Sequence, residues 1–158
     1  MRLRELLAQL SNAQVRFVVI GGVALIARGV ERATADLDVA YARDRANLSR
    51  LASVLAPLHP RVRGVPEGLP FVLDEASLRN GLNFTLDTDL GPLDLLGEVP
   101  GLGTFEHVDE ASSELEIDGV RMLVLTVEGL ERSKRAAGRP KDLLDLGYLK
   151  KLRAQSGA

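Results

Sequence analysis

Two aspartates separated by one residue, Asp36 and Asp38, form the pattern in this chain that most clearly indicates chemistry. The apolar residues that alternate with them, Leu37 and Val39, predict a strand, in which every second side chain points to the same face. Both carboxylates would then lie on one face, while the leucine and valine pack into a core. Carboxylate oxygens are ligands that Mg²⁺ prefers in proteins. The pair therefore predicts a divalent-cation site.

A glycine pair, Gly21 and Gly22, precedes these acids, and thirteen residues separate Gly22 from Asp36. The apolar run Phe17–Ile20 before the glycines predicts a short buried strand, so the glycines are expected to open a helix. Backbone without side chains at a helix N-terminus lets a phosphate approach N–H groups that carry partial positive charge. The glycine turn and the acids together predict a place for a metal-bound nucleotide.

The order of these motifs resembles the pattern of the nucleotidyltransferase superfamily. That pattern has an apolar residue, Gly-Gly or Gly-Ser, an Asp-apolar-Asp/Glu-apolar run, and later a third acid in an apolar-acid-apolar strand. The run Leu93–Leu95 supplies Asp94 as the third acid. Asp87 and Asp89 compete for this role, but they are also interpretable as turn residues, and the flanking leucines favour Asp94.

The resemblance implies an enzyme in which an acceptor hydroxyl attacks the α-phosphorus of an NTP and pyrophosphate leaves. It implies one or two Mg²⁺ ions that stabilise both ends of the displacement. Asp36 and Asp38 would hold the ion on the triphosphate side, and Asp36 with Asp94 the ion that activates the hydroxyl. Gly21 and Gly22 would contact the phosphates.

Further segments narrow the resemblance to the AbiEii-type branch, which includes toxins of toxin–antitoxin systems. They are Arg32 and Thr34 before the acids, the hairpin FTLDTDLGPLDLLGEVPG, and the late segment KRAAGRPKDLLDL. The resemblance covers roughly residues 15 to 150. It implies tRNA as the acceptor and a cognate antitoxin as a partner, with Arg32 or Thr34 orienting the phosphates.

The late segment places Lys134 on one predicted helix and two acids, Asp142 and Asp145, on the next. In the resembling toxins a lysine and an aspartate of this region contribute to activity, so Lys134 is expected to be a catalytic cation, while the choice between the two acids stays open. The nucleotide-binding residues predicted here are Lys134, Arg139, Lys141, Asp142 and Asp145. The alternative interpretation is a pair of surface helices with a Lys141–Asp145 ion pair, worth about 0.3–0.5 kcal/mol.

The remaining periodicity predicts an α/β (α+β) fold, a nucleotidyltransferase-like mixed sheet with helices on its faces. We expect one domain over residues 1–158, with a core at about 15–125 and C-terminal helices at about 126–153. Residues 59–70, with three prolines and two glycines, predict a loop at the rim of the site. The expected strands are Phe17–Ile20, Asp36–Ala40, Leu82–Asp87, Pro92–Leu96, Ser113–Ile117 and Val120–Leu125. A first helix is expected to carry the leucines Leu3 to Leu10 on one face. The other expected helices span Val23–Arg28, Arg45–Ala56 and Val127–Ala137, the last after an N-cap at Thr126, and a final helix begins at Pro140.

Composition excludes several classes of site. The chain of 158 residues is 46% hydrophobic and has no cysteine, which removes disulfides, thiolate metal sites and a cysteine nucleophile. His59 and His107 lie in turn-rich segments and are interpreted as exposed loop residues. No apolar run approaches the roughly 18 residues that cross a bilayer, and the N-terminus lacks a signal-peptide core, so we expect a cytoplasmic protein without a membrane partner.

Charge favours no general affinity for nucleic acid, since the net charge is −2. Basic residues gather near the C-terminus, where they are suited either to phosphates or to the ends of helices.

Two other functions stay open. One is nucleotidylation of a small antibiotic, as in lincosamide-type transferases of similar length; the other is a non-catalytic, antitoxin-like interaction protein with the same fold, against which the intact set of three acids argues.

Overall fold

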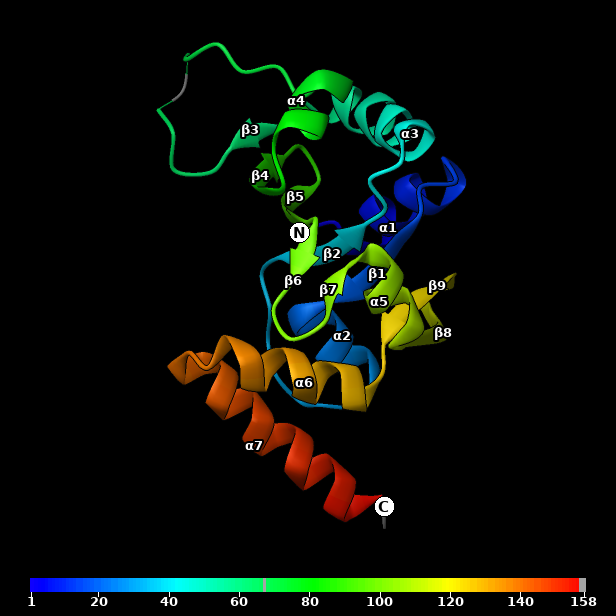
Figure 1. Ribbon diagram of the computed structural model, residues 1–158, viewed down its shortest axis with the longest axis vertical. Coiled ribbons are helices and arrows are strands. Elements are labelled where there is room, and N and C mark those ends of the chain that lie inside the picture. The colour runs from blue at the N-terminus through cyan, green and yellow to red at the C-terminus, as the bar shows by residue number, and fades with distance from the viewer. Residues whose placement is uncertain (67, 157–158) are drawn as a thin grey trace.

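A seven-stranded mixed sheet forms the centre of the computed structural model, which describes residues 1–66 and 68–156 (Figure 1). Its strand order is β3-β4-β5-β2-β1-β9-β8, and two further strands, β6 and β7, pair separately. The strands of the sheet are β1 (Phe17–Ile20), β2 (Leu37–Tyr41), β3 (Arg61–Val62), β4 (Asn83–Thr88), β5 (Gly91–Leu96), β8 (Ser112–Ile117) and β9 (Val120–Leu125). The separate pair is β6 (Glu98–Val99) with β7 (Gly103–Thr104). The predicted mixed α/β architecture is confirmed.

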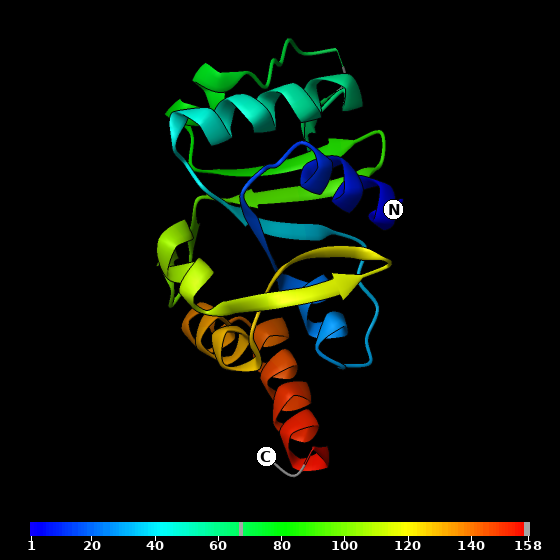
Figure 2. The ribbon, with the colours of Figure 1, turned by 90° about the vertical axis from the view of Figure 1, so that its right-hand side faces the viewer.

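Helices flank this sheet (Figure 2). They are α1 (Leu3–Asn12), α2 (Gly21–Ala27), α3 (Arg45–Leu55), α4 (Glu75–Asn80), α5 (Phe105–Glu110), α6 (Val127–Ala137) and α7 (Pro140–Gln155), with a 3₁₀ turn at Ala56–Leu58. Helix α1 packs on β9 and α3, whereas α2 packs on β1, β2 and α6. Figure 2 shows α7 projecting from the body at the end far from α3. No helix in the described part of the chain is both long and apolar enough to span a membrane.

The register of the central strands decides which residues enter the core. Strand β2 runs parallel to β5, and Asp38 pairs with Asp94. Leu37 and Leu93 are fully buried, as is Leu95. Because side chains alternate along a strand, the two acids project from the face opposite these leucines.

The predicted elements are found with small shifts at their ends. Helix α2 begins at Gly21 instead of Val23, and β2 begins at Leu37, so Asp36 directly precedes the strand. The last helix continues to Gln155, beyond the predicted end at 153. The 59–70 loop holds the short strand β3, and Glu67 within it lies outside the described residues.

Local chemistry explains the ends of α6 and α7. The Thr126 hydroxyl accepts a hydrogen bond from the Gly129 amide at 3.1 Å, which makes it the predicted N-cap of α6. Gly138, with φ of 64°, ends α6 in the left-handed region, and Pro140 starts α7 in its first turn. The two helices therefore meet at a sharp turn and pack against each other.

The histidines take two different places. His59 is exposed and lies 2.6 Å from Asp89 through Nδ1, consistent with the predicted surface position. His107 is also exposed, but it lies on α5 instead of a loop. Helix α5 is only six residues long, too short to leave a recognisable period in the sequence.

Candidate active site

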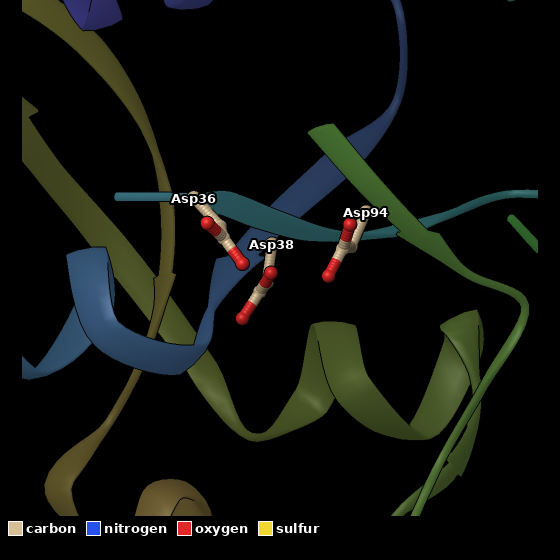
Figure 3. A group of neighbouring side chains, drawn as sticks. All are labelled: Asp36, Asp38 and Asp94. Carbon is tan, nitrogen blue, oxygen red and sulfur yellow. The ribbon is translucent and has the colours of Figure 1, made fainter. Parts of the chain in front are cut away.

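Three carboxylates converge on one face of the sheet (Figure 3). One oxygen from each of Asp36, Asp38 and Asp94 lies within 4.8 Å of the others. Asp38 and Asp94 are register partners on the parallel strands β2 and β5, and Asp36 precedes Asp38 by two residues. The predicted convergence is thus a consequence of strand phase and parallel pairing.

Asp38 is the most constrained of the three acids. Its Oδ1 atom is buried and has no hydrogen-bond partner. Burial, reinforced by the nearby Asp94 and Asp36, raises the pKa of Asp38 to about 7, while the charge of Lys134 opposes the rise. A buried acceptor without a donor, next to two other carboxylates, fits a hard cation with oxygen ligands.

The glycine pair leaves room for these acids. Gly21 lines the site with φ of 65°, and a Cβ added there would overlap the Asp38 carboxylate. A Cβ on Gly22 would come within 2.7 Å of the Thr34 hydroxyl. Close packing against Asp38 and Thr34 is a second reason for two glycines, beside the predicted phosphate contact.

The Gly21→Ala substitution is expected to weaken divalent-cation binding at the three acids strongly, because the new methyl group must displace Asp38. A matched control is Gly119→Ala, which also has positive φ, 83°, but no atom within 4 Å of the added Cβ. Both variants should lose about 1 kcal/mol of stability from the backbone conformation alone. Thermal unfolding and Mn²⁺ titration measured together separate the two effects, and equal Mn²⁺ affinity in both variants would contradict the packing argument.

A second group of charges lies on α6 and α7. Lys134 Nζ lies 3.4 Å from Asp142 Oδ1 and 3.1 Å from Asp145 Oδ2. Both aspartates are buried, with 0% and 3% of their surfaces exposed. Arg32 Nη1 contacts Asp145 at 2.6 Å, and Arg139 Nε contacts Asp142 at 2.7 Å. Each of the two buried acids therefore contacts both Lys134 and one arginine.

Hydrogen bonding keeps Asp142 ionised inside this group. Burial pushes its pKa upward, but hydrogen bonds from Arg139 and the charge of Lys134 outweigh burial, so the pKa lies below its ordinary value. The alternative Lys141–Asp145 ion pair is not formed among the described residues, because Asp145 is turned toward Lys134 and Arg32. The interpretation of ordinary surface helices is therefore wrong for the acids of α7.

The other predicted site residues take distinct places. Thr34 donates from its hydroxyl to the Asp36 carbonyl at 3.3 Å, beside Gly22. Arg139 and Lys141 line the same cavity as Asp38 and Lys134. Arg32, in contrast, has its guanidinium on Asp145.

Arg63 is a site residue that the sequence did not reveal. It follows β3, and its guanidinium contacts Asp94 at 2.9 Å, Asp87 at 3.1 Å and Asp36 at 3.8 Å. Among the described residues, the three-acid group includes neither of the competing acids. Asp87 is joined to the group through Arg63, and Asp89 pairs with His59. The polar-apolar-polar alternation of Arg61-Val62-Arg63 is typical of a strand, but three residues are too few to predict one.

A cavity of about 930 Å³ lies between two of the three acids, Asp38 and Asp94, and Lys134. Asp38 and Asp94 lie on its sheet side, and Lys134 on the side formed by α6. Apolar residues that include Leu82, Leu96, Val99, Leu102 and Leu130 complete its wall. The volume lies within the range of small-molecule and cofactor sites, about 300–1,000 Å³.

Comparison with known proteins identifies the fold. No protein-family model matches the chain, and no curated protein sequence matches it. The lincomycin-bound lincosamide antibiotic adenylyltransferase LnuA superposes with a TM-score of 0.58 at 15% identity, covering 96% of each chain. ANT(2")-Ia in complex with adenylyl-2"-tobramycin gives 0.57 at 16% identity, covering 97% of this chain and 93% of that one. A Thermotoga maritima protein described as a candidate nucleotidyltransferase gives 0.53 at 16%, covering 98% and 88%. The predicted nucleotidyltransferase-like fold is thus confirmed.

Proposed function

We propose that this chain is a divalent-metal-dependent nucleotidyltransferase, which moves a nucleotide from an NTP to an acceptor hydroxyl and releases pyrophosphate. The observation that carries the proposal is the convergence of Asp36, Asp38 and Asp94, with a buried Asp38 oxygen that no protein donor reaches. The fold shared with two antibiotic-modifying nucleotidyltransferases supports it.

The three acids would hold Mg²⁺, which supplies neutralisation of phosphate charge and a lowered pKa for the attacking hydroxyl. Gly21 keeps the backbone clear of the Asp38 carboxylate. Lys134 brings a positive charge to the cavity wall, where it suits the triphosphate. Asp142 and Asp145 both contact Lys134, so both acids of α7 would position this lysine.

For the acceptor we propose a hydroxyl of tRNA, with a cognate antitoxin as a partner. The support is the resemblance of the KRAAGRPKDLLDL segment to AbiEii-type toxins, together with the cations Arg139 and Lys141 at the cavity. The described surface offers few aromatic side chains on which bases stack, so contact limited to one end of the RNA fits best.

A small hydroxylated molecule is the second candidate acceptor. The observation that favours it is the cavity itself, since its volume of about 930 Å³ and its apolar wall of Leu82, Leu96 and Val99 suit a ligand of antibiotic size. Lincomycin and adenylyl-tobramycin are bound by the structurally similar proteins.

Transfer of label separates these candidates. The protein is incubated with Mg²⁺ and each α-³²P-labelled NTP, together with total RNA, a protein extract, or a panel of lincosamides and aminoglycosides. Label in RNA supports the first acceptor, and label in a small molecule supports the second. Absence of label from every acceptor, with no pyrophosphate released, would contradict the proposed enzymatic activity. It would favour the alternative of a non-catalytic interaction protein with the same fold.

The third acid has its own test. Asp94→Asn is expected to lower the transfer rate by about 10²-fold or more, because metal stabilisation is worth several kcal/mol and each 1.4 kcal/mol is tenfold. Asp89→Asn is the matched control, since Asp89 lies in the adjacent turn and pairs with His59. Equal rates for the two variants would remove Asp94 from the reaction.

A further inference from the structure

Arg63 links the three-acid group to a further carboxylate, Asp87. Three of its nitrogens reach three different carboxylates: Nη2 contacts Asp94, Nε contacts Asp87, and Nη1 lies 3.8 Å from Asp36. Its Nη2 also donates to the Leu86 carbonyl at 2.7 Å. These contacts fix the guanidinium over the acidic face, although 29% of the side chain remains exposed.

Strand register places Arg63 beside the acids. The Arg63 amide donates to the Thr85 carbonyl at 2.9 Å, which continues the pairing of β3 with β4. Thr85 in turn pairs with Asp94, and Asp94 pairs with Asp38. Thr85, Asp94 and Asp38 therefore form one row across three strands, with Arg63 at its end directly after β3, and the long arginine side chain spans the short threonine to reach Asp94.

Negative charge is in excess around this row. Asp36, Asp38, Asp87 and Asp94 lie within reach of one another or of Arg63, which is the cation that contacts three of them among the described residues. Like charges repel more strongly in partly buried positions than in water. A fixed guanidinium therefore lowers the repulsion that would otherwise drive Asp36 and Asp94 apart.

We propose that Arg63 is a positioning residue that holds the Asp36 and Asp94 carboxylates together as an internal counter-cation and competes with a divalent ion shared by those two acids. The inference rests on the proposed function, because it takes the three acids as the ligands of that ion. Asp87 gives the guanidinium a carboxylate of its own, outside the three-acid group, to which it stays attached when an ion takes Asp94. Arg63 therefore sets the concentration of metal at which the site fills.

Metal titration without nucleotide tests this role. Mn²⁺ binding to wild type and to Arg63→Gln is measured by calorimetry and by the electron paramagnetic resonance signal of free Mn²⁺. A unit charge about 4 Å from a divalent ion corresponds to about 30-fold in affinity at the dielectric constant of water, and salt screens part of this, so Arg63→Gln should bind Mn²⁺ at least about fivefold more tightly. Arg63→Lys, which keeps the charge but not the forked geometry, should lie between the two.

The matched control is Arg61→Ala, two residues away, whose side chain contacts Asp89 and the His59 carbonyl instead of the three acids. It should bind Mn²⁺ as wild type does. Thermal unfolding supplies a second readout: Arg63→Gln should melt below wild type in EDTA, and saturating Mn²⁺ should close the gap. An equal gap with and without Mn²⁺ would indicate a merely structural arginine and overturn the proposal.

The two proposals fail in different ways. If Asp36→Asn weakens Mn²⁺ binding but Arg63→Gln and Arg63→Lys leave it unchanged, the counter-cation role is wrong and the metal site stands. If wild type and Asp36→Asn bind Mn²⁺ equally, the three acids are not the ligands, and both proposals are overturned.

Discussion

Replacing either Asp36 or Asp38 with asparagine is expected to abolish nucleotidyl transfer, but the two substitutions should differ in their effect on stability. Each removes a carboxylate that would hold Mg²⁺, so the rate should fall by at least about 10²-fold. The Asp36 side chain is 42% exposed, and Asp36→Asn should leave the unfolding temperature nearly unchanged. The Asp38 side chain is half-buried and its Oδ1 atom is buried without a partner, and Asp38→Asn should raise the unfolding temperature of the metal-free protein.

The pH dependence of this stabilisation follows from the raised pKa of Asp38. In the unfolded chain the group titrates near 3.8, whereas in the folded protein burial and the nearby acids raise its pKa to about 7. Between these values the folded state binds the proton and the unfolded state does not, so stability is lost as pH rises from about 4 to about 7. The advantage of Asp38→Asn should be small near pH 4 and fully developed above pH 7.

Thermal unfolding in EDTA across this range measures the difference between wild type and Asp38→Asn. Saturating Mg²⁺ should reduce it, because the cation stabilises the ionised carboxylate of wild type but finds one ligand fewer in the variant. A constant difference at every pH would show that the ionisation of Asp38 does not limit stability. Retained transfer in either variant would contradict its role as a metal ligand.

The three acids were predictable from the sequence because their placement depends on rules that act locally. Alternation along β2 sets the phase of Asp38, and the flanking leucines set the phase of Asp94. Once these buried strands pair in parallel, both acids must share a face. The glycine pair was likewise visible, although its packing against Asp38 and Thr34 depends on tertiary distances.

Arg63 was not predictable by these rules. It follows a two-residue strand in a segment rich in proline and glycine, where the sequence favours a loop. Its contact with Asp94 depends on the pairing of β3 with β4, which no local pattern encodes. The Arg32–Asp145 contact, across 113 positions of the chain, was hidden for the same reason.

Helix α7 inverts the usual relation between polarity and burial. Asp142 and Asp145 are buried, whereas Leu143 and Leu144 are 57% and 58% exposed. Hydrophobic periodicity assigns the acids of such a helix to solvent, which is why surface helices were a reasonable alternative. The buried acids are instead retained by charges from three other positions, Lys134, Arg32 and Arg139, and this arrangement makes Lys134 more than a surface cation.

Lys134→Met is therefore expected to lower both NTP affinity and stability. Only 12% of the Lys134 side chain is exposed, and its loss leaves each buried aspartate with a single arginine. Unfolding free energy should fall by about 1–3 kcal/mol, the range for a buried polar group that loses one partner. Loss of a charge-assisted contact with the triphosphate should weaken Mg²⁺-NTP binding by about tenfold or more.

Two further variants separate the support of the fold from the binding of nucleotide. Arg135→Ala, on the exposed side of the same helix, removes an equal charge and should change neither quantity. Lys134→Met combined with Asp145→Asn neutralises an acid that has lost a cation, so it should recover part of the stability but none of the NTP affinity. Calorimetric titration of Mg²⁺-NTP decides the matter: affinity equal to wild type in Lys134→Met would confine the nucleotide site to the three acids and the glycine turn. Recovery of affinity in the double variant would instead show that Lys134 acts on nucleotide only through the packing of α6 on α7.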